Sequence, residues 1–274
     1  MTPKSISGFI AQRDEEGYKN QYGKVLIVAG NSMYGGAGIL AAQGAVYSGA
    51  GLVTLASDPV NRSALHARLP ECMFLDWTNH GLLLERLSQF DTILIGPGLG
   101  LDGVAYTLME MVLSGVSASQ NVIIDGDGIT LYAKGDLPRP DASLYFTPHA
   151  GEWERLSGLT DDCETNLEKA KELGATVILK GHRTRVFAED EVWQNMYGSS
   201  AMATGGMGDT LAGIIAGLMK QAAEPIEGVL AAVFFHSYIG DILAKKRFVV
   251  LPSQIATELP IYLKIFSEMS ESAY

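Results

Sequence analysis

Short apolar runs recur along this chain, and each of them ends in glycines or in a polar turn. Five runs have the length and composition of buried strands: 24–29 (KVLIVA), 92–95 (TILI), 122–124 (VII), 144–146 (LYF) and 176–179 (TVIL). Segments with helical patterns lie between several of them, including the alanine-rich stretch 39–47 and the charged stretch 164–173. Strands that alternate with helices predict an α/β fold, with a mainly parallel sheet covered by helices on both faces.

The last third of the chain follows a different pattern. Residues 185–188 and 192–196 flank the acidic turn 189–191 and predict a hairpin, which would give the sheet an antiparallel edge. After a glycine-rich loop the chain is predicted to be helical at 211–221, 225–246 and 252–266. Neither a linker nor a repeat is visible, so we expect residues 1–274 to form a single domain.

Six stretches rich in glycine or polar residues mark the ends of these elements. GNSMYGGAG, GPGLG, DGDG, TPHAGE and KGHRT each follow a predicted strand, and TGGMGD precedes a helix. One glycine cluster is weak evidence, since such turns are common in α/β folds. Ligands of open parallel sheets bind at the carboxyl ends of the strands. The joint placement of the six stretches therefore predicts one binding site at one edge of the sheet.

Composition and charge limit the classes of partner. The 20 Lys and Arg and 31 Asp and Glu residues give a net charge of −11, which argues against nucleic acid or an anionic membrane. Nucleotides remain possible because local features hold them. The two cysteines show no metal-binding spacing, the N-terminus has no apolar signal core, and we expect no apolar run to reach the ~18 residues of a membrane span. We therefore expect a cytoplasmic protein.

The loop 204–208 is the segment best suited to holding phosphate. Gly205, Gly206 and Gly208 allow several backbone N–H groups to face one point, and the N-terminus of the following helix adds partial positive charge. Asp209 at the start of that helix could be an ordinary first-turn acid, which is common and stabilising. Beside a bound phosphate it can instead take a proton from an attacking hydroxyl, so we predict that Asp209 is a general base.

The remaining loops allow two interpretations each. The turn 180–184 could be simply exposed, or it could line a nucleotide with its lysine, threonine and amides. His149 could be a solvent-exposed loop residue or could meet a polar ligand at the sheet edge. Asp125 and Asp127 could be turn residues, or they could handle Mg²⁺ through water. His236 lies on an apolar helical face and is predicted to be a core histidine.

The motifs together resemble a known family. TGGMGD followed by LAGIIAGL resembles the anion-hole loop and catalytic Asp of the ribokinase-like fold. With GGAGILAAQGAVYSGAGLVTLAS, IGPGLG, TPHAGEWERL and LKG followed by Thr184, the pattern resembles the ADP- or ATP-dependent NAD(P)H-hydrate dehydratases over residues 20–245 or so. The resemblance implies a ribokinase-like three-layer sandwich. It also implies repair of (6S)-NADHX or NADPHX: ADP phosphorylates the ring hydroxyl, phosphate leaves with help from the ring nitrogen, and NADH or NADPH and AMP result.

The resemblance also assigns residues and partners. Gly36, Ala37, Gly98 and His149 would contact the hydrate, and Asp209 would touch both reactants. The residues expected to contact the nucleotide are Lys180, Gly181, His182, Arg183, Thr184, Gly205, Gly206 and Gly208. Mg²⁺ would accompany ADP or ATP without a direct protein ligand. Relatives are often tetramers, and the small-residue helix after Gly38 could pack between subunits.

Many relatives carry an epimerase domain before this one. Only about twenty residues precede the first predicted strand, so we expect a separate protein to supply the epimerase activity. Two alternatives stay open: a ribokinase-like kinase of a vitamin precursor, of the hydroxyethylthiazole or pyridoxal type, and a non-catalytic nucleotide sensor. TPHAGE and GGAG argue against the kinase, and an intact Asp209 argues against the sensor.

Overall fold

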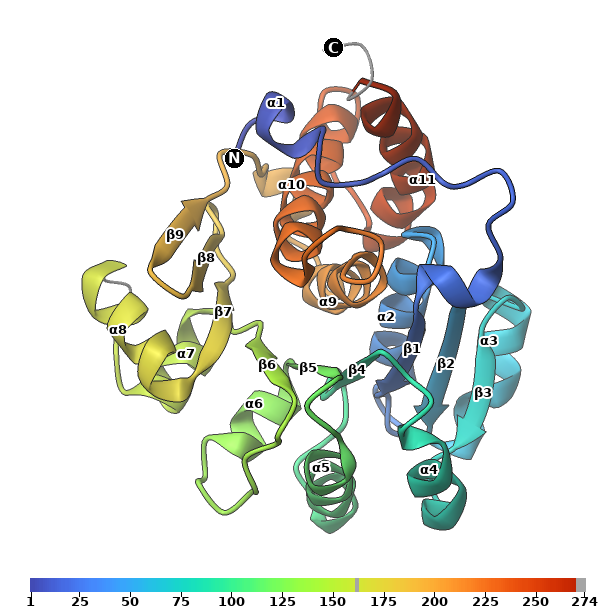
Figure 1. Cartoon of the computed structure of the whole chain (residues 1–274). Coiled ribbons are helices and arrows are strands. Elements are labelled where there is room, and N and C mark those ends of the chain that lie inside the picture. The colour runs from blue at the N-terminus through green and yellow to red at the C-terminus, as the bar shows by residue number, and fades with distance from the viewer. Residues whose placement is uncertain (161–162, 270–274) are drawn as a thin grey trace.

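A mixed sheet forms the centre of the molecule in the computed structural model, which describes residues 1–160 and 163–269. Within these residues nine strands pair in the order β3-β2-β1-β4-β5-β6-β7-β8-β9 (Figure 1). The strands from β3 to β7 pair in parallel, whereas β8 and β9 are antiparallel at one edge. The predicted α/β architecture and its antiparallel edge are therefore confirmed.

The strands are short and follow the apolar runs of the sequence. Their bounds are β1 (Lys24–Val28), β2 (Leu52–Ser57), β3 (Met73–Asp76), β4 (Thr92–Ile95), β5 (Asn121–Ile124), β6 (Ser143–Phe146), β7 (Ala175–Leu179), β8 (Arg185–Ala188) and β9 (Glu191–Gln194). The helices are α1 (Pro3–Ile6), α2 (Gly35–Tyr47), α3 (Arg62–Arg68), α4 (His80–Leu87), α5 (Gly103–Gly115), α6 (Asp127–Tyr132), α7 (Ala150–Ser157), α8 (Cys163–Leu173), α9 (Met207–Leu218), α10 (Pro225–Ala244) and α11 (Pro252–Met269).

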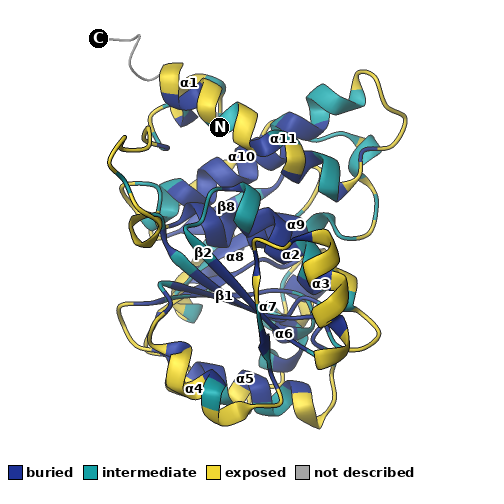
Figure 2. Cartoon of the chain, turned by 90° about the vertical axis from the view of Figure 1, so that its right-hand side faces the viewer, coloured by how far each residue is buried: buried dark blue, intermediate teal, exposed yellow. Residues whose placement is uncertain are grey.

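The two faces of the sheet carry separate apolar cores. Successive side chains of a strand point to opposite faces. Val25 and Ile27 of β1 accordingly pack with α2, α9, α10 and α11, whereas Leu26 and Val28 pack with α4, α5 and α6. Trp153 of α7 joins a third, smaller core with α8, β7 and β8. Figure 2 shows the resulting layers, with a buried sheet between helices whose outer faces are exposed.

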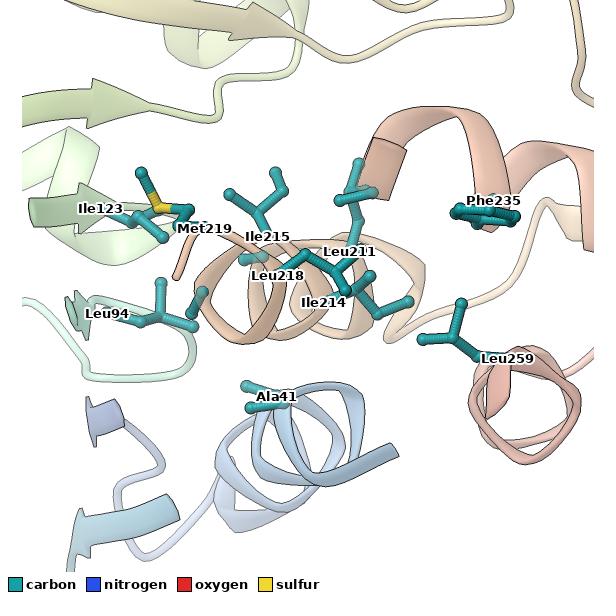
Figure 3. Packing of buried hydrophobic residues seen from close by; sticks show 14 of the residues in the cluster. Ala41, Leu94, Ile123, Leu211, Ile214, Ile215, Leu218, Met219, Phe235 and Leu259 are labelled. Atoms are coloured by element: carbon teal, nitrogen blue, oxygen red, sulfur yellow. The ribbon is translucent and has the colours of Figure 1, made fainter. Parts of the chain in front are cut away.

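Helix α9 is enclosed on all sides. Its apolar side chains meet Leu94 and Ile123 of the sheet, α10 and α11 on one flank, and α2 across the other (Figure 3). The contact with α2 is backbone to backbone, because a Cβ on Gly213 would lie 2.0 Å from the carbonyl oxygen of Ala41. The small residues of α2 therefore serve packing within the chain. The expectation that this helix also packs between subunits stays a prediction.

The structure differs from the predictions at two helix starts and in one long apolar helix. Helix α2 begins at Gly35 rather than Ile39, so the glycines that looked like loop residues form its first turn. Helix α9 begins at Met207, two residues before Asp209. Helix α10 spans 20 residues and is long and apolar enough to cross a membrane, which the sequence reading missed. Two thirds of its most apolar window is buried inside the protein, as expected of a core helix.

Candidate active site

The chain changes direction between two neighbouring strands, and this change creates a crevice. From β1 the chain proceeds outward to β2 and β3, and it then returns to place β4 on the other side of β1. The loops after β1 and β4 meet there: the Asn31 amide donates to the Gly98 carbonyl at 2.7 Å, and the Gly30 amide donates to Pro97 at 2.9 Å. Such a reversal of strand order is where open α/β sheets bind ligands.

Three of the residues predicted to contact the hydrate come together at this crevice. Gly98 has a φ of +55°, and a Cβ there would lie 2.8 Å from Cβ of Tyr34 and 2.9 Å from Cβ of Ala37. Only glycine fits this close approach without strain. Gly36 occupies the first turn of α2 and faces open space, so a ligand can reach its backbone.

The predicted anion loop forms the N-terminus of α9. Gly206 caps the helix with a φ of +89°, and a Cβ there would meet Leu40 at 2.4 Å. No side chain caps this helix, so its first N–H groups remain available for an anion. Asp209 is the third residue of the helix. Burial raises its pKa to about 6, the negative charges of Asp125 and others add to this effect, and Lys180 opposes it.

A buried ion cluster lies next to the anion loop. Lys180 Nζ donates to Asp125 Oδ1 at 2.6 Å and lies 4.0 Å from Glu152 Oε2. The Thr147 hydroxyl donates to the same Asp125 oxygen at 2.7 Å. Burial lowers the pKa of Lys180, but the charges of Asp125 and Glu152 outweigh it and hold that pKa above its usual value. A Cβ on Gly208 would lie 3.1 Å from Lys180 Nζ, so the ammonium lies directly beside the anion loop.

His149 has a structural task that the sequence reading did not assign. Its Nδ1 accepts from the Gly151 and Glu152 amides at 3.0 and 3.3 Å, and Glu152 Oε2 accepts from the His149 amide at 2.7 Å. The two residues thus form a reciprocal cap for α7. Because Nδ1 is an acceptor, the ring hydrogen lies on Nε2. The side chain is 57% exposed, so its Nε2–H, which lies 3.4 Å from Glu152 Oε1, is also accessible to a ligand.

The turn after β7 opens onto a cavity of about 480 Å³. Lys180, Gly181, His182 and Thr184 line it together with Gly208, whereas Arg183 is not among the lining residues. The remaining walls come from 198–203, α9 and α10, including His236. The cavity therefore joins the predicted nucleotide residues to the anion loop. A larger cavity of about 660 Å³ lies among α2, α11 and 10–13, and it contains none of the predicted site residues.

His236 is buried, as the sequence predicts, but it also borders this cavity. Burial lowers its pKa to about 4, so the ring is neutral at ordinary pH.

The two aspartates after β5 differ in their surroundings: Asp125 is almost fully buried, while Asp127 is partly exposed and its Oδ2 accepts from the Gly100 amide at 2.8 Å. Within residues 1–160 and 163–269, no three His, Cys, Asp or Glu side chains are placed to hold a metal ion.

All six loops marked in the sequence therefore meet at one edge. The residues that sequence reasoning missed are Glu152 and Thr147, which complete the ion cluster, and Asn31, whose backbone joins the first loop to the second. Thr147 and Asp125 both follow apolar runs, which is a usable signal, but their contact depends on β5 and β6 being neighbours. The sequence alone does not predict that these two strands are neighbours in the sheet.

Comparison with known proteins agrees with this geometry. Residues 25–261 match the family model described as NAD(P)H-hydrate dehydratase. The ADP-dependent (S)-NAD(P)H-hydrate dehydratase of Listeria monocytogenes is 62% identical over 273 residues, covering 100% of this chain and 99% of that protein. The Bacillus subtilis ADP/ATP-dependent NAD(P)H-hydrate dehydratase, co-crystallised with ATP/Mg²⁺, superposes with a TM-score of 0.86 at 28% identity, covering 97% of each chain.

A third relative has a longer chain. The bifunctional NAD(P)H-hydrate repair enzyme of Moorella thermoacetica is 35% identical over 259 residues, covering 87% of this chain and 48% of that protein. The match to the family model over most of the chain, the identity to the Listeria protein and the ribokinase-like architecture lead to one conclusion. The chain belongs to the NAD(P)H-hydrate dehydratase family.

Proposed function

We propose that this chain is an ADP-dependent (S)-NAD(P)H-hydrate dehydratase, a lyase that returns damaged NADHX or NADPHX to NADH or NADPH. The observation that carries the proposal is the position of Asp209. It lies in the first turn of α9, beside the anion loop and the cavity, and its charge interacts with the cluster at the carboxyl ends of β5 to β7. A carboxylate placed there can contact the hydroxyl acceptor and the phosphoryl donor at the same time.

The chemistry of the substrate explains why such a base is needed. Hydration of the reduced nicotinamide adds a hydroxyl to a ring carbon bonded to nitrogen and a hydrogen to the neighbouring carbon. Hydroxide is a poor leaving group, whereas phosphate is a good one. Asp209 takes the hydroxyl proton as the oxygen attacks the terminal phosphoryl group of ADP, and the amides of 206–208 stabilise the transferred group. AMP is released, and the nitrogen lone pair then expels phosphate.

The pKa of Asp209 suits this task. A base works best when its pKa lies near the operating pH, and burial has moved this carboxyl from 3.8 to about 6. Lys180 compensates part of the negative charge in the site and lies beside Gly208. Gly36, Ala37 and Gly98 offer backbone to the hydrate, while the Nε2–H of His149 can donate to it.

The other partners follow from the same reaction. Magnesium would supply charge neutralisation on the phosphates of ADP or ATP, and Asp125 and Asp127 are the carboxylates that could meet its water ligands. The R epimer of the hydrate needs an epimerase, and the longer Moorella relative supports a link between the two activities. We also propose a cytoplasmic location and a homotetramer, on the basis of the resemblance to relatives of this kind.

A direct assay distinguishes this proposal from its alternatives. The protein is mixed with (6S)-NADHX, Mg²⁺ and either ADP or ATP, and the reduced-nicotinamide absorbance is followed while AMP is measured by chromatography. We expect absorbance to return with ADP, with one AMP per NADH. Failure with both nucleotides would reject the proposal. Phosphorylation of hydroxyethylthiazole or pyridoxal would favour a vitamin kinase, and nucleotide binding without any turnover would favour a sensor.

A further inference from the structure

Dehydration of the hydrate removes two protons, and Asp209 accounts for only one. When phosphate leaves with the help of the ring nitrogen, the product is a cationic C=N⁺ species. The C=C bond returns only when the neighbouring carbon loses the proton that hydration placed on it. Asp209 already holds the hydroxyl proton at that moment. A second base must therefore lie near the same ring, and the proposed function does not name it.

The charge interactions of Asp209 identify the carboxylates close to the reaction. Burial is the main cause of its raised pKa, and the negative charges of Asp125, Asp127 and Glu152 add to it. Lys180, which lies beside Gly208, contacts Asp125 and Glu152, and Asp127 lies two residues after Asp125, so the three carboxylates belong to the same edge of the sheet as Asp209. Their hydrogen bonds decide which of them is free to accept a proton.

Asp125 and Glu152 are both committed to other groups. Asp125 is 1% exposed, and its Oδ1 accepts from both Lys180 and Thr147. Glu152 Oε2 accepts from the His149 amide at 2.7 Å, and Oε1 lies 3.4 Å from His149 Nε2. Each carboxylate is buried and already accepts from a positive or N–H group, which limits its access to a ligand.

Asp127 differs in both respects. Its Oδ2 accepts from the Gly100 amide at 2.8 Å, which anchors the carboxylate to the loop after β4. That loop also contains Gly98, which lies against Ala37 and Tyr34 at the hydrate crevice. Within residues 1–160 and 163–269, Oδ1 has no hydrogen-bond partner, and the residue is partly exposed. One oxygen of Asp127 thus fixes the side chain, and the other remains available to accept a proton.

We propose that Asp127 is the second base, which removes the ring-carbon proton after phosphate has left. The proposal rests on the proposed function. The C–O bond to phosphate breaks and its electron pair leaves with phosphate, while the nitrogen lone pair forms C=N⁺. The C–H bond on the neighbouring carbon then breaks, its electron pair forms C=C, and the nitrogen lone pair is restored. Asp127 takes the proton and later releases it to water.

The test measures two products in parallel. With full-length Asp127→Asn, (6S)-NADHX, ADP and Mg²⁺, we expect NADH formation to fall by about 10²-fold or more, while AMP formation falls by less than about tenfold. A cation that cannot lose its proton adds water, which gives back the hydrate, or adds phosphate, which gives back the phosphate ester. The ratio of AMP to NADH should therefore rise from one to above about ten.

The Asn variant keeps the shape of the side chain and a carbonyl oxygen for the Gly100 amide, so folding should be preserved. Asp102→Asn is the matched control, because Asp102 caps α5 nearby through the Ala105 amide and has no place in the site. It should keep wild-type rates and a ratio of one.

Three results would have different meanings. A fall in AMP and NADH together, at a ratio of one, would place Asp127 at or before phosphoryl transfer and overturn the assignment. Unchanged rates at a ratio of one would show that another base, such as the departing phosphate, takes the proton, and would also overturn it. Absence of NADH with the wild-type protein would instead reject the proposed function itself. Asp209→Asn should lose both products.

Discussion

Replacing Asp209 by Asn should remove activity and at the same time stabilise the fold. The carboxyl has a pKa of about 6 in the folded protein against 3.8 for the ordinary side chain, with burial as the main cause. The folded state therefore binds this proton more tightly than the unfolded state does. Ionisation destabilises the fold as pH rises from 3.8 to 6, and the full penalty is present above that range. Asparagine stays neutral and avoids this penalty.

The size of the effect follows from the two pKa values. Their difference corresponds to about 3 kcal/mol, which is an upper limit because Asp209 is partly exposed and water screens its charge. For a chain of this length, a stability change of 1 kcal/mol moves the melting temperature by roughly 1.7 °C. Asp209→Asn should therefore melt up to about 5 °C higher than the wild type at pH 8.

Thermal melts of both proteins between pH 4 and pH 8 provide the assay. The difference in melting temperature should be small near pH 4, grow through pH 6 and level off above it. Asp102→Asn, which keeps a cap on α5, should show a small difference that does not vary with pH. An Asp209→Asn protein that is no more stable than the wild type at pH 8 would refute the claim that burial destabilises the ionised form of this carboxyl group.

Further variants and conditions test other parts of the account. Because Asp209 acts as a base, kcat/KM of the dehydratase should fall as pH drops below about 6, and a profile flat to pH 5 would contradict its role. Lys180→Met leaves Asp125 buried without its cation and should cost about 3–5 kcal/mol, seen as a melting point lower by roughly 5–9 °C, whereas Lys169→Met at a surface pair should change little. Gly213→Ala places a methyl group against the Ala41 carbonyl and should cost at least about 1–3 kcal/mol in urea unfolding, while Gly103→Ala, with open space around it, should be nearly neutral.

Much of the fold could be predicted because the local signals agree with the final structure. The apolar runs at 24–29 and 122–124 are too short for helices and too apolar for an exposed surface, so they identify buried strands. The hairpin of β8 and β9 is equally local. The start of α2 was misplaced because Gly35, Gly36 and Gly38 have low helix propensity. Tertiary packing overrides that propensity, since a Cβ on Gly38 would meet the Ala29 carbonyl at 3.0 Å.

The site was predictable in its parts but not in its connections. The glycine loops and Asp209 indicate phosphoryl transfer from the sequence alone. An anion loop needs the backbone freedom of glycine, and a base needs the carboxylate of Asp209. The salt bridge from Lys180 to Asp125 joins β7 to β5 across β6, so it depends on strand order. The prediction that Lys180 contacts the nucleotide did not include this partner. His149 likewise looked like a ligand residue, and its role as the cap of α7 appears only in three dimensions.

The central claim is that Asp209 is the base that links nucleotide to hydrate, and one measurement tests it most directly. The affinity of Asp209→Asn for ADP is measured by calorimetry, and its turnover of (6S)-NADHX is measured in the same buffer. The account predicts that ADP binding is largely kept, because the amides of 206–208 and the cavity walls are unchanged, while turnover falls by about 10²- to 10⁴-fold. Turnover equal to that of the wild type would contradict the account.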